Sequence, residues 1–163
     1  MIAIGLGVTS FAVMLMVALP ADLFGRASDL TTTFAAESPQ VAVVDGDTLR
    51  MRDTLVRLRG TVAPSRGQLC QSGPAMTVDC GTASSTALAG LVRGRAVSCQ
   101  ANGRDRRGFV LANCEAAGVN LNRAMVSEGW SRAEPDDAAM RATEREAQRG
   151  ERGLWWGGGT LPL

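Results

Sequence analysis

The sequence predicts a small α+β domain with a curled antiparallel sheet, preceded by an apolar N-terminal segment. Three observations support this fold class. Short runs of alternating apolar and polar residues begin at Val41, as in half-buried strands. Stretches with helical periodicity follow toward the C-terminus, and capping residues mark their ends. Residues 1–21 carry no charge and are long enough to cross a bilayer as a helix.

The first 21 residues are predicted to be a transmembrane helix. As a helix they would span about 31 Å, enough to cross the hydrocarbon core. A cleaved signal peptide is the alternative, but no Lys or Arg precedes Arg26, so the basic start of such a peptide is missing. We therefore expect a retained anchor or uncleaved signal at residues 1–21, followed by a linker at 22–40 without strand or helix periodicity.

The strand-rich half begins with an acidic corner. Asp45-Gly46-Asp47 lies between the apolar runs 41–44 and 49–52, which predicts two strands joined by a glycine turn. Two carboxylates at such a turn suit calcium or magnesium when another acid completes the site, whereas a plain hairpin turn is the alternative. Residues 54–60 alternate next, so we expect Arg57 and Arg59 on one face of a third strand.

Start and stop signals mark three helices in the second half. An N-cap residue or proline opens each one, and a glycine or a basic last turn closes it. Between the first and second helices, residues 96–101 and 109–114 form a predicted strand pair around the polar turn 102–107. Residues 157–163 are expected to be a flexible tail. The helix boundaries are, in order, Thr82 and Gly94, Asn120 and Gly129, and Pro135 and Arg149.

Composition excludes several kinds of chemistry. All 17 basic residues are arginine, and the chain contains no lysine, histidine or tyrosine. Histidine-based triads, histidine zinc sites, Schiff-base lysines and tyrosine acids are therefore impossible. Beyond residue 40 the chain has 17 − 1 = 16 arginines and 16 − 3 = 13 acids, a net charge of +3. That balance is too weak for nucleic-acid binding by bulk electrostatics.

The four cysteines are predicted to form two disulfides. Cys99 and Cys114 lie on the two arms of the expected hairpin, where facing residues have numbers that sum to 213, and Cys70 and Cys80 bracket one loop. A zinc site is the alternative, but spacings of ten, nineteen and fifteen lack the paired pattern of structural zinc. Disulfides imply an oxidising compartment, so we expect an inner-membrane, single-pass protein with its folded domain in the periplasm.

A series of short motifs between residues 41 and 156 keeps the order and spacing of a known family. They are Val44-Asp45-Gly46-Asp47-Thr48-Leu49, Arg57-Leu58, Ala63-Pro64, Cys80-Gly81, Gly108, Leu111-Ala112, Leu121-Asn122, Met125-Val126, Glu128-Gly129-Trp130 and Gly153-Leu154-Trp155. With these motifs the chain resembles the staphylococcal nuclease-like, or thermonuclease, family. The resemblance implies a five-stranded OB-type β-barrel packed with three helices.

The resemblance also implies a calcium-dependent phosphodiesterase site. In active members two aspartates hold calcium, a glutamate lies near the attacking water and two arginines bind the phosphodiester. Asp47 matches the first metal aspartate and Asp45 is its companion in the turn, while Arg57 matches the first arginine. Arg59 and Arg107 are further candidates for binding phosphate.

Three positions of the family site have lost the required side chain. The second metal aspartate falls on Val62, the glutamate on Ser65 and the second arginine on Phe109. Valine cannot bind a cation, serine is not basic at neutral pH, and phenylalanine cannot bind a phosphate. Arg107 would share a strand face with Phe109 and could take over part of the role of the missing second arginine. Asp79 is the remaining acid considered as a metal ligand.

These losses favour a catalytically inactive, membrane-anchored domain. Its expected role is that of a binding or structural accessory subunit in a membrane protein complex, with no cofactor. One alternative is a weak calcium-dependent nuclease with relocated ligands. The other is a non-catalytic nucleic-acid binder that uses Arg57, Arg59 and Arg107.

Overall fold

The structure of the protein is a computed structural model that describes residues 32–71 and 76–160. The predicted anchor at 1–21 lies outside the described residues. In the described ranges, 32–71 and 76–160, no helix is both long and apolar enough to span a bilayer.

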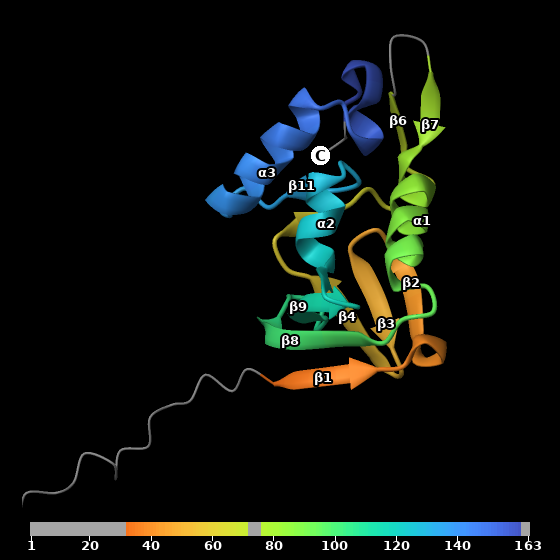
Figure 1. The fold of residues 1–163 in the computed structure, drawn as a ribbon, viewed down its shortest axis with the longest axis vertical. Helices are drawn as coiled ribbons and strands as arrows, with labels where there is room; N and C mark the ends of the chain where they lie inside the picture. The colour runs from red at the N-terminus through yellow and green to blue at the C-terminus, as the bar shows by residue number, and fades with distance from the viewer. Residues whose placement is uncertain (1–31, 72–75, 161–163) are drawn as a thin grey trace, which may run out of the picture. The chain divides into compact units, whose positions relative to one another are not determined.

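A mixed α+β fold is present, as predicted: a strand-rich sheet packs with three α-helices (Figure 1). The sheet has seven strands in the order β1-β8-β9-β4-β3-β2, and β10 pairs with β9. All pairings are antiparallel except β4 with β9. The strands are β1 (Thr33–Ala36), β2 (Val41–Asp45), β3 (Thr48–Met51), β4 (Thr54–Leu58), β8 (Val97–Arg104), β9 (Val110–Ala116) and β10 (Val119–Asn120).

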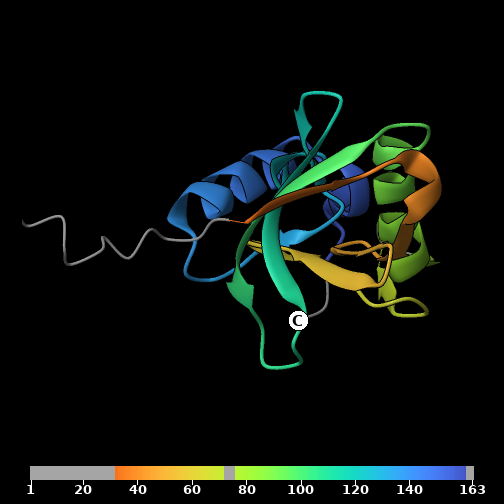
Figure 2. The same cartoon turned by 90° about the horizontal axis from the view of Figure 1, so that it is seen from below.

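The expected five-stranded OB-type β-barrel does not close. The sheet curls strongly (Figure 2), but β1 and β2 are its two edges and do not pair with each other. The 3-10 turn η2 (Ser38–Gln40) separates them in the chain, and Pro39 within it has no N–H for a strand ladder. The sheet is therefore open along this line, with its two edge strands consecutive in sequence.

Part of the expected linker belongs to the sheet. Residues 33–36 form β1 and pair with Val97–Gln100 of β8, so the fold begins before residue 41. Ala36 is buried and Phe34 packs against the core. The segment shows weak alternation in sequence because threonine and alanine contribute little contrast in hydropathy, so its pairing with β8 decides its structure.

Two small ribbons flank the sheet. The strand β5 (Thr61–Val62) pairs with β11 (Arg132–Ala133), and β6 (Leu69–Gln71) pairs with β7 (Thr77–Asp79). The expected flexible tail continues this second ribbon in part. Its residues 157 and 158 end the 3-10 helix η3 (Gly153–Gly158), and Thr160 forms a bridge with Gln71.

The three helices are α1 (Cys80–Val92), α2 (Leu121–Ser127) and α3 (Ala138–Arg149). Asn120 caps α2 as predicted, accepting a hydrogen bond from the Arg123 N–H. The other two helices are capped by aspartates, Asp79 and Asp137, instead of starting at the predicted residues Thr82 and Pro135. An aspartate side chain that accepts the N3 amide satisfies a free helix donor and places a negative charge at the positive helix end.

The main core lies between the sheet and the helices α1 and α2. Val56 and Leu58 of β4 are fully buried in it, whereas Arg57 and Arg59 occupy the opposite face, as the alternation predicts. A second cluster joins Trp155 and Leu154 of η3 to α3 and the start of α1.

One of the two predicted disulfides is present. Strands β8 and β9 pair in the predicted register, so Cys99 faces Cys114 and the two are bonded. Cys70 and Cys80 are both free and buried. The β6–β7 register places Cys70 opposite Val78, and Cys80 starts α1 with its Sγ 3.1 Å from the Gln68 carbonyl oxygen.

Candidate functional site

The acidic corner is shaped by close packing against α1. Residues 46 and 47 form the turn between β2 and β3, and Val44 is the extra residue of a bulge just before it. Gly46 is buried, and a Cβ there would collide with the hydroxyl of Ser84 on α1. Among the described residues that hydroxyl has no hydrogen-bond partner. Glycine is needed here because the helix approaches too closely for any side chain.

Both carboxylate oxygens of Asp47 are occupied by groups of the protein. Asp47 is 4% exposed. Its Oδ1 accepts the Thr48 hydroxyl at 2.7 Å, and its Oδ2 accepts Arg57 Nη2 at 3.0 Å and the Ala63 N–H at 3.2 Å. The carboxylate thereby joins the corner to β4 and to the chain after β5, which satisfies a buried charge with a full set of donors.

Arg57 lies between two aspartates. Besides Asp47, its Nη1 lies 3.9 Å from Oδ2 of Asp105, in the loop between β8 and β9. Asp105 also accepts the N–H groups of Arg107 and Phe109, at 2.8 and 2.9 Å, and so fixes that loop. Asp105 belongs to none of the family motifs. Its contact with Arg57 becomes visible only in the structure, where the two residues lie close together.

Arg66 is a second residue that motif reasoning missed. Its Nε donates to the Val44 carbonyl at 2.6 Å and its Nη2 to the Val43 carbonyl at 3.3 Å, while its N–H lies 3.4 Å from Oδ1 of Asp45. Both carbonyls belong to β2, which is bulged here and lies at the edge of the sheet, paired only with β3 among the described strands. Arg66 therefore attaches the loop after β5 to the corner, with its guanidinium on the β2 carbonyls and its backbone N–H on Asp45.

The three altered positions add no ligand to this cluster. Val62 pairs with Arg132 in the small ribbon and leaves 37% of its surface exposed. The N–H of Ser65 donates to Gln68, and its side chain is exposed. Phe109 is half-buried at the end of the loop that Asp105 holds.

Arg107 does not lie where the sequence predicts. Strand β8 ends at Arg104 and β9 begins at Val110, so Arg107 belongs to a turn and not to the strand face next to Phe109. The turn forms because Asp105 accepts two backbone amides in succession, which bends the chain at Gly108. Arg59 and Arg107 are exposed, and neither forms an ion pair within the described residues.

Comparison with known proteins identifies the fold family. Residues 55–157 match the model of a family described as staphylococcal nuclease homologue. The chain belongs to the staphylococcal nuclease homologue family. One relative is the succinoglycan biosynthesis protein ExoI of Rhizobium meliloti (strain 1021), which is 30% identical over 120 residues. The match covers 71% of this chain and 63% of that protein, so the chain spans less than two thirds of the relative's length.

The residues at the position implied for calcium in this family do not fit a calcium ion. Calcium takes six to eight oxygen ligands. Here Asp47 is hydrogen-bonded to the Arg57 guanidinium, Oδ1 of Asp45 accepts the backbone N–H of Arg66, and residue 62 is a valine. In the parts of the chain that the structure describes, no group of three acidic, cysteine or histidine side chains could hold a metal.

Asp79 does not supply the missing ligand. Its Oδ1 accepts the Thr82 N–H and its Oδ2 the Thr82 hydroxyl, both at 2.8 Å. The hydrogen bond from the Thr82 N–H, followed by that from its hydroxyl, lowers the pKa of Asp79 below its usual 3.8. In this member of the nuclease homologue family Asp79 is a helix cap, with both oxygens engaged at the start of α1.

Proposed function

We propose that the protein is a catalytically inactive member of the staphylococcal nuclease homologue family that serves as a binding or structural accessory subunit. The observation that supports this most is the internal pairing of Asp47. Arg57, expected to bind a phosphodiester, neutralises the aspartate that would bind metal. The two groups that remain from the family site therefore bind each other, while Val62, Ser65 and Phe109 supply none of the missing chemistry.

The cellular setting is part of the same proposal. The uncharged segment 1–21 supports an inner-membrane anchor, and the Cys99–Cys114 disulfide supports a periplasmic domain. The relative's name connects a protein of this family with the biosynthesis of succinoglycan, a glycan. We therefore infer an accessory role in a membrane protein complex that handles glycans at the cell envelope.

A nuclease assay tests the loss of activity. The full-length chain in detergent is incubated with single-stranded DNA in millimolar calcium and, separately, in EDTA. The wild-type chain is expected to give no calcium-dependent cleavage. A matched variant, Val62→Asp with Ser65→Glu and Phe109→Arg, restores the family side chains at positions that are exposed or half-buried and is the positive control.

The assay has a clear contrary outcome. Calcium-dependent cleavage by the wild-type chain, lost in Asp47→Asn, would show that the protein is a nuclease. The assay uses the full chain because truncation at residue 41 would remove β1 from the sheet.

Affinity purification from detergent-solubilised membranes tests the accessory role. The tagged full-length chain is expected to elute with a membrane protein in a fixed ratio. Recovery only as a free monomer would contradict the proposed complex.

A further inference from the structure

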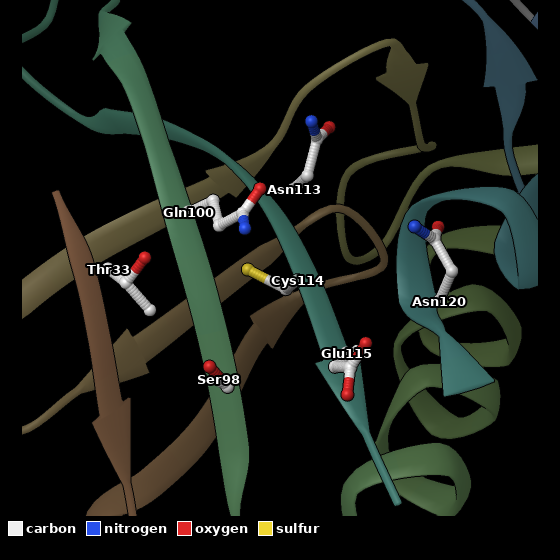
Figure 3. Close-up of a pocket in the computed structure, with 7 residues that line it drawn as sticks. All are labelled: Thr33, Ser98, Gln100, Asn113, Cys114, Glu115 and Asn120. Carbon is white, nitrogen blue, oxygen red and sulfur yellow. The ribbon is translucent and has the colours of Figure 1, made fainter. Parts of the chain in front are cut away.

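A polar hollow of about 310 Å³ lies on the outer face of the sheet, where β1, β8, β9 and β10 run side by side (Figure 3). None of its lining residues belongs to the cluster around Asp47. Its volume is at the lower end of the range for sites that bind small ligands. The lining residues are Thr33, Ser98, Gln100, Asn113, Cys114, Glu115 and Asn120.

Strand register arranges the polar side chains in two rows. Gln100 of β8 is the partner of both Thr33 on β1 and Asn113 on β9, so these three residues form one row across the strands. Since side chains alternate between faces, the residues two positions along form the next row. That row contains Ser98, Glu115 and Asn120.

The polar groups of this hollow are available to a ligand. Among the described residues, five of its side chains make no hydrogen bond or ion pair with the protein. Asn120 uses its Oδ1 to cap α2 and keeps its amide N–H₂ group free. In Figure 3 the amides of Gln100 and Asn113 project from neighbouring strands. The five unpaired side chains are those of Thr33, Ser98, Gln100, Asn113 and Glu115.

The chemistry of the lining selects among ligand classes. A carboxamide offers a hydrogen-bond donor and an acceptor side by side, which suits the adjacent hydroxyls of a sugar. A hydroxyl side chain can both donate and accept a hydrogen bond. Glu115 can accept from a hydroxyl in a charge-assisted hydrogen bond but repels a polyanion. Among the described residues that line the hollow there is no arginine and no large apolar side chain, so the lining does not favour a phosphate chain or a lipid tail.

We propose that this hollow, built on β8 and β9 and closed at its ends by Thr33 and Asn120, binds a neutral glycan through its hydroxyl groups. The inference rests on the proposed function, because it gives the accessory domain its ligand class. The site lies on the strands that the Cys99–Cys114 disulfide joins, so the two amide-bearing strands are fixed relative to each other.

An NMR titration tests the site directly. The ¹⁵N-labelled full-length chain, in a detergent without sugar headgroups, is titrated with cellohexaose, laminarihexaose and maltohexaose. We expect one of these probes to shift the side-chain amide signals of Gln100 and Asn113. Dissociation constants on the order of 1 mM are expected, since a few net hydrogen bonds supply the affinity.

Paired variants locate the binding. Gln100→Ala combined with Asn113→Ala removes both central amides and is expected to weaken binding at least about tenfold, measured for all variants from the backbone amide shifts of β8 and β9. Gln71→Ala and Asn102→Ala are the matched controls, because they remove exposed amides outside the hollow and are expected to leave the affinity within about twofold. Backbone amide spectra of every variant show whether the fold is retained.

Several outcomes would overturn the inference. It fails if none of the three hexasaccharides shifts the Gln100 and Asn113 amides, or if the double variant binds as well as its controls. Shifts of the same amides by a single-stranded oligodeoxynucleotide alone would assign the face to nucleic acid instead. These results are independent of the nuclease assay and the purification, so a failed glycan site and a failed accessory role can be told apart.

Discussion

At the scale of single residues, Arg57 is the group on which the remodelled site depends. Removing its guanidinium leaves the buried carboxylate of Asp47 without its main partner. We predict that Arg57→Gln lowers the free energy of unfolding by about 1–3 kcal/mol, less than for a fully buried pair because Arg57 is 31% exposed. Urea unfolding of the full-length chain, followed by tryptophan fluorescence, measures the change.

Arg59→Gln is the matched control for this prediction. Arg59 lies on the same face of the chain but is exposed, and its side chain forms no ion pair within the described residues. Its replacement is expected to change stability by no more than about 0.5 kcal/mol. Equal unfolding midpoints for the two variants would show that the Asp47 pair carries no net stability.

The residue scale also shows where sequence reasoning stops. Asp47 and Arg57 could be selected in advance because each lies inside a recognisable local motif. Asp105 and Arg66 could not, because they reach the site through contacts 48 and 22 residues away in sequence, which no local pattern encodes. The residue types at positions 62, 65 and 109 can be read from the sequence, but the occupation of Asp47 by Arg57 was visible only in three dimensions.

At the scale of elements, α1 contains two glycines with opposite requirements. Gly90 is exposed, and a Cβ there would meet nothing within 4 Å. Gly90→Ala is therefore predicted to raise the free energy of unfolding by about 0.5–1 kcal/mol, because alanine restricts the unfolded chain and favours helix. Urea unfolding measures this gain against the wild-type chain.

Gly81, in the first turn of the same helix, provides the contrast. A Cβ at Gly81 would collide with the backbone carbonyl of Ser65, which cannot swing away as a side chain can. Gly81→Ala is expected to lower the free energy of unfolding by about 1–3 kcal/mol. If Gly81→Ala raised the free energy of unfolding as Gly90→Ala does, the close packing of Gly81 against Ser65 would be contradicted.

Elements were predictable where a signal lies within them. The β8–β9 register follows from two hairpin arms and a cysteine pair, and Asn120 marks the start of α2 on its own. The strand β1 was missed because its partner, β8, lies more than 60 residues away and because its own residues alternate little in hydropathy. The same holds for the two-residue strands β5 and β11, which are defined only by their pairing.

At the scale of the whole molecule, the missing residue types simplify its response to pH. With no lysine, tyrosine or histidine in the chain, thiols are the only side chains with ordinary pKa values between about 6 and 11. Cys99 and Cys114 are bonded, which leaves Cys70 and Cys80.

This leads to a prediction for stability at high pH. Burial, followed by the hydrogen bond to the Cys80 thiol, raises the pKa of Cys70 from 9.0 to about 12. Between these values the folded chain keeps a proton that the unfolded chain releases, so stability is complete below pH 9.0 and falls as the pH rises toward 12. The urea midpoint is expected to decline over this window in the wild-type chain and much less in Cys70→Ala. Equal declines in the two chains would show that the loss of stability at high pH does not come from the Cys70 thiol. If the denatured wild-type chain contained no titratable thiol, Cys70 and Cys80 would be bonded to each other.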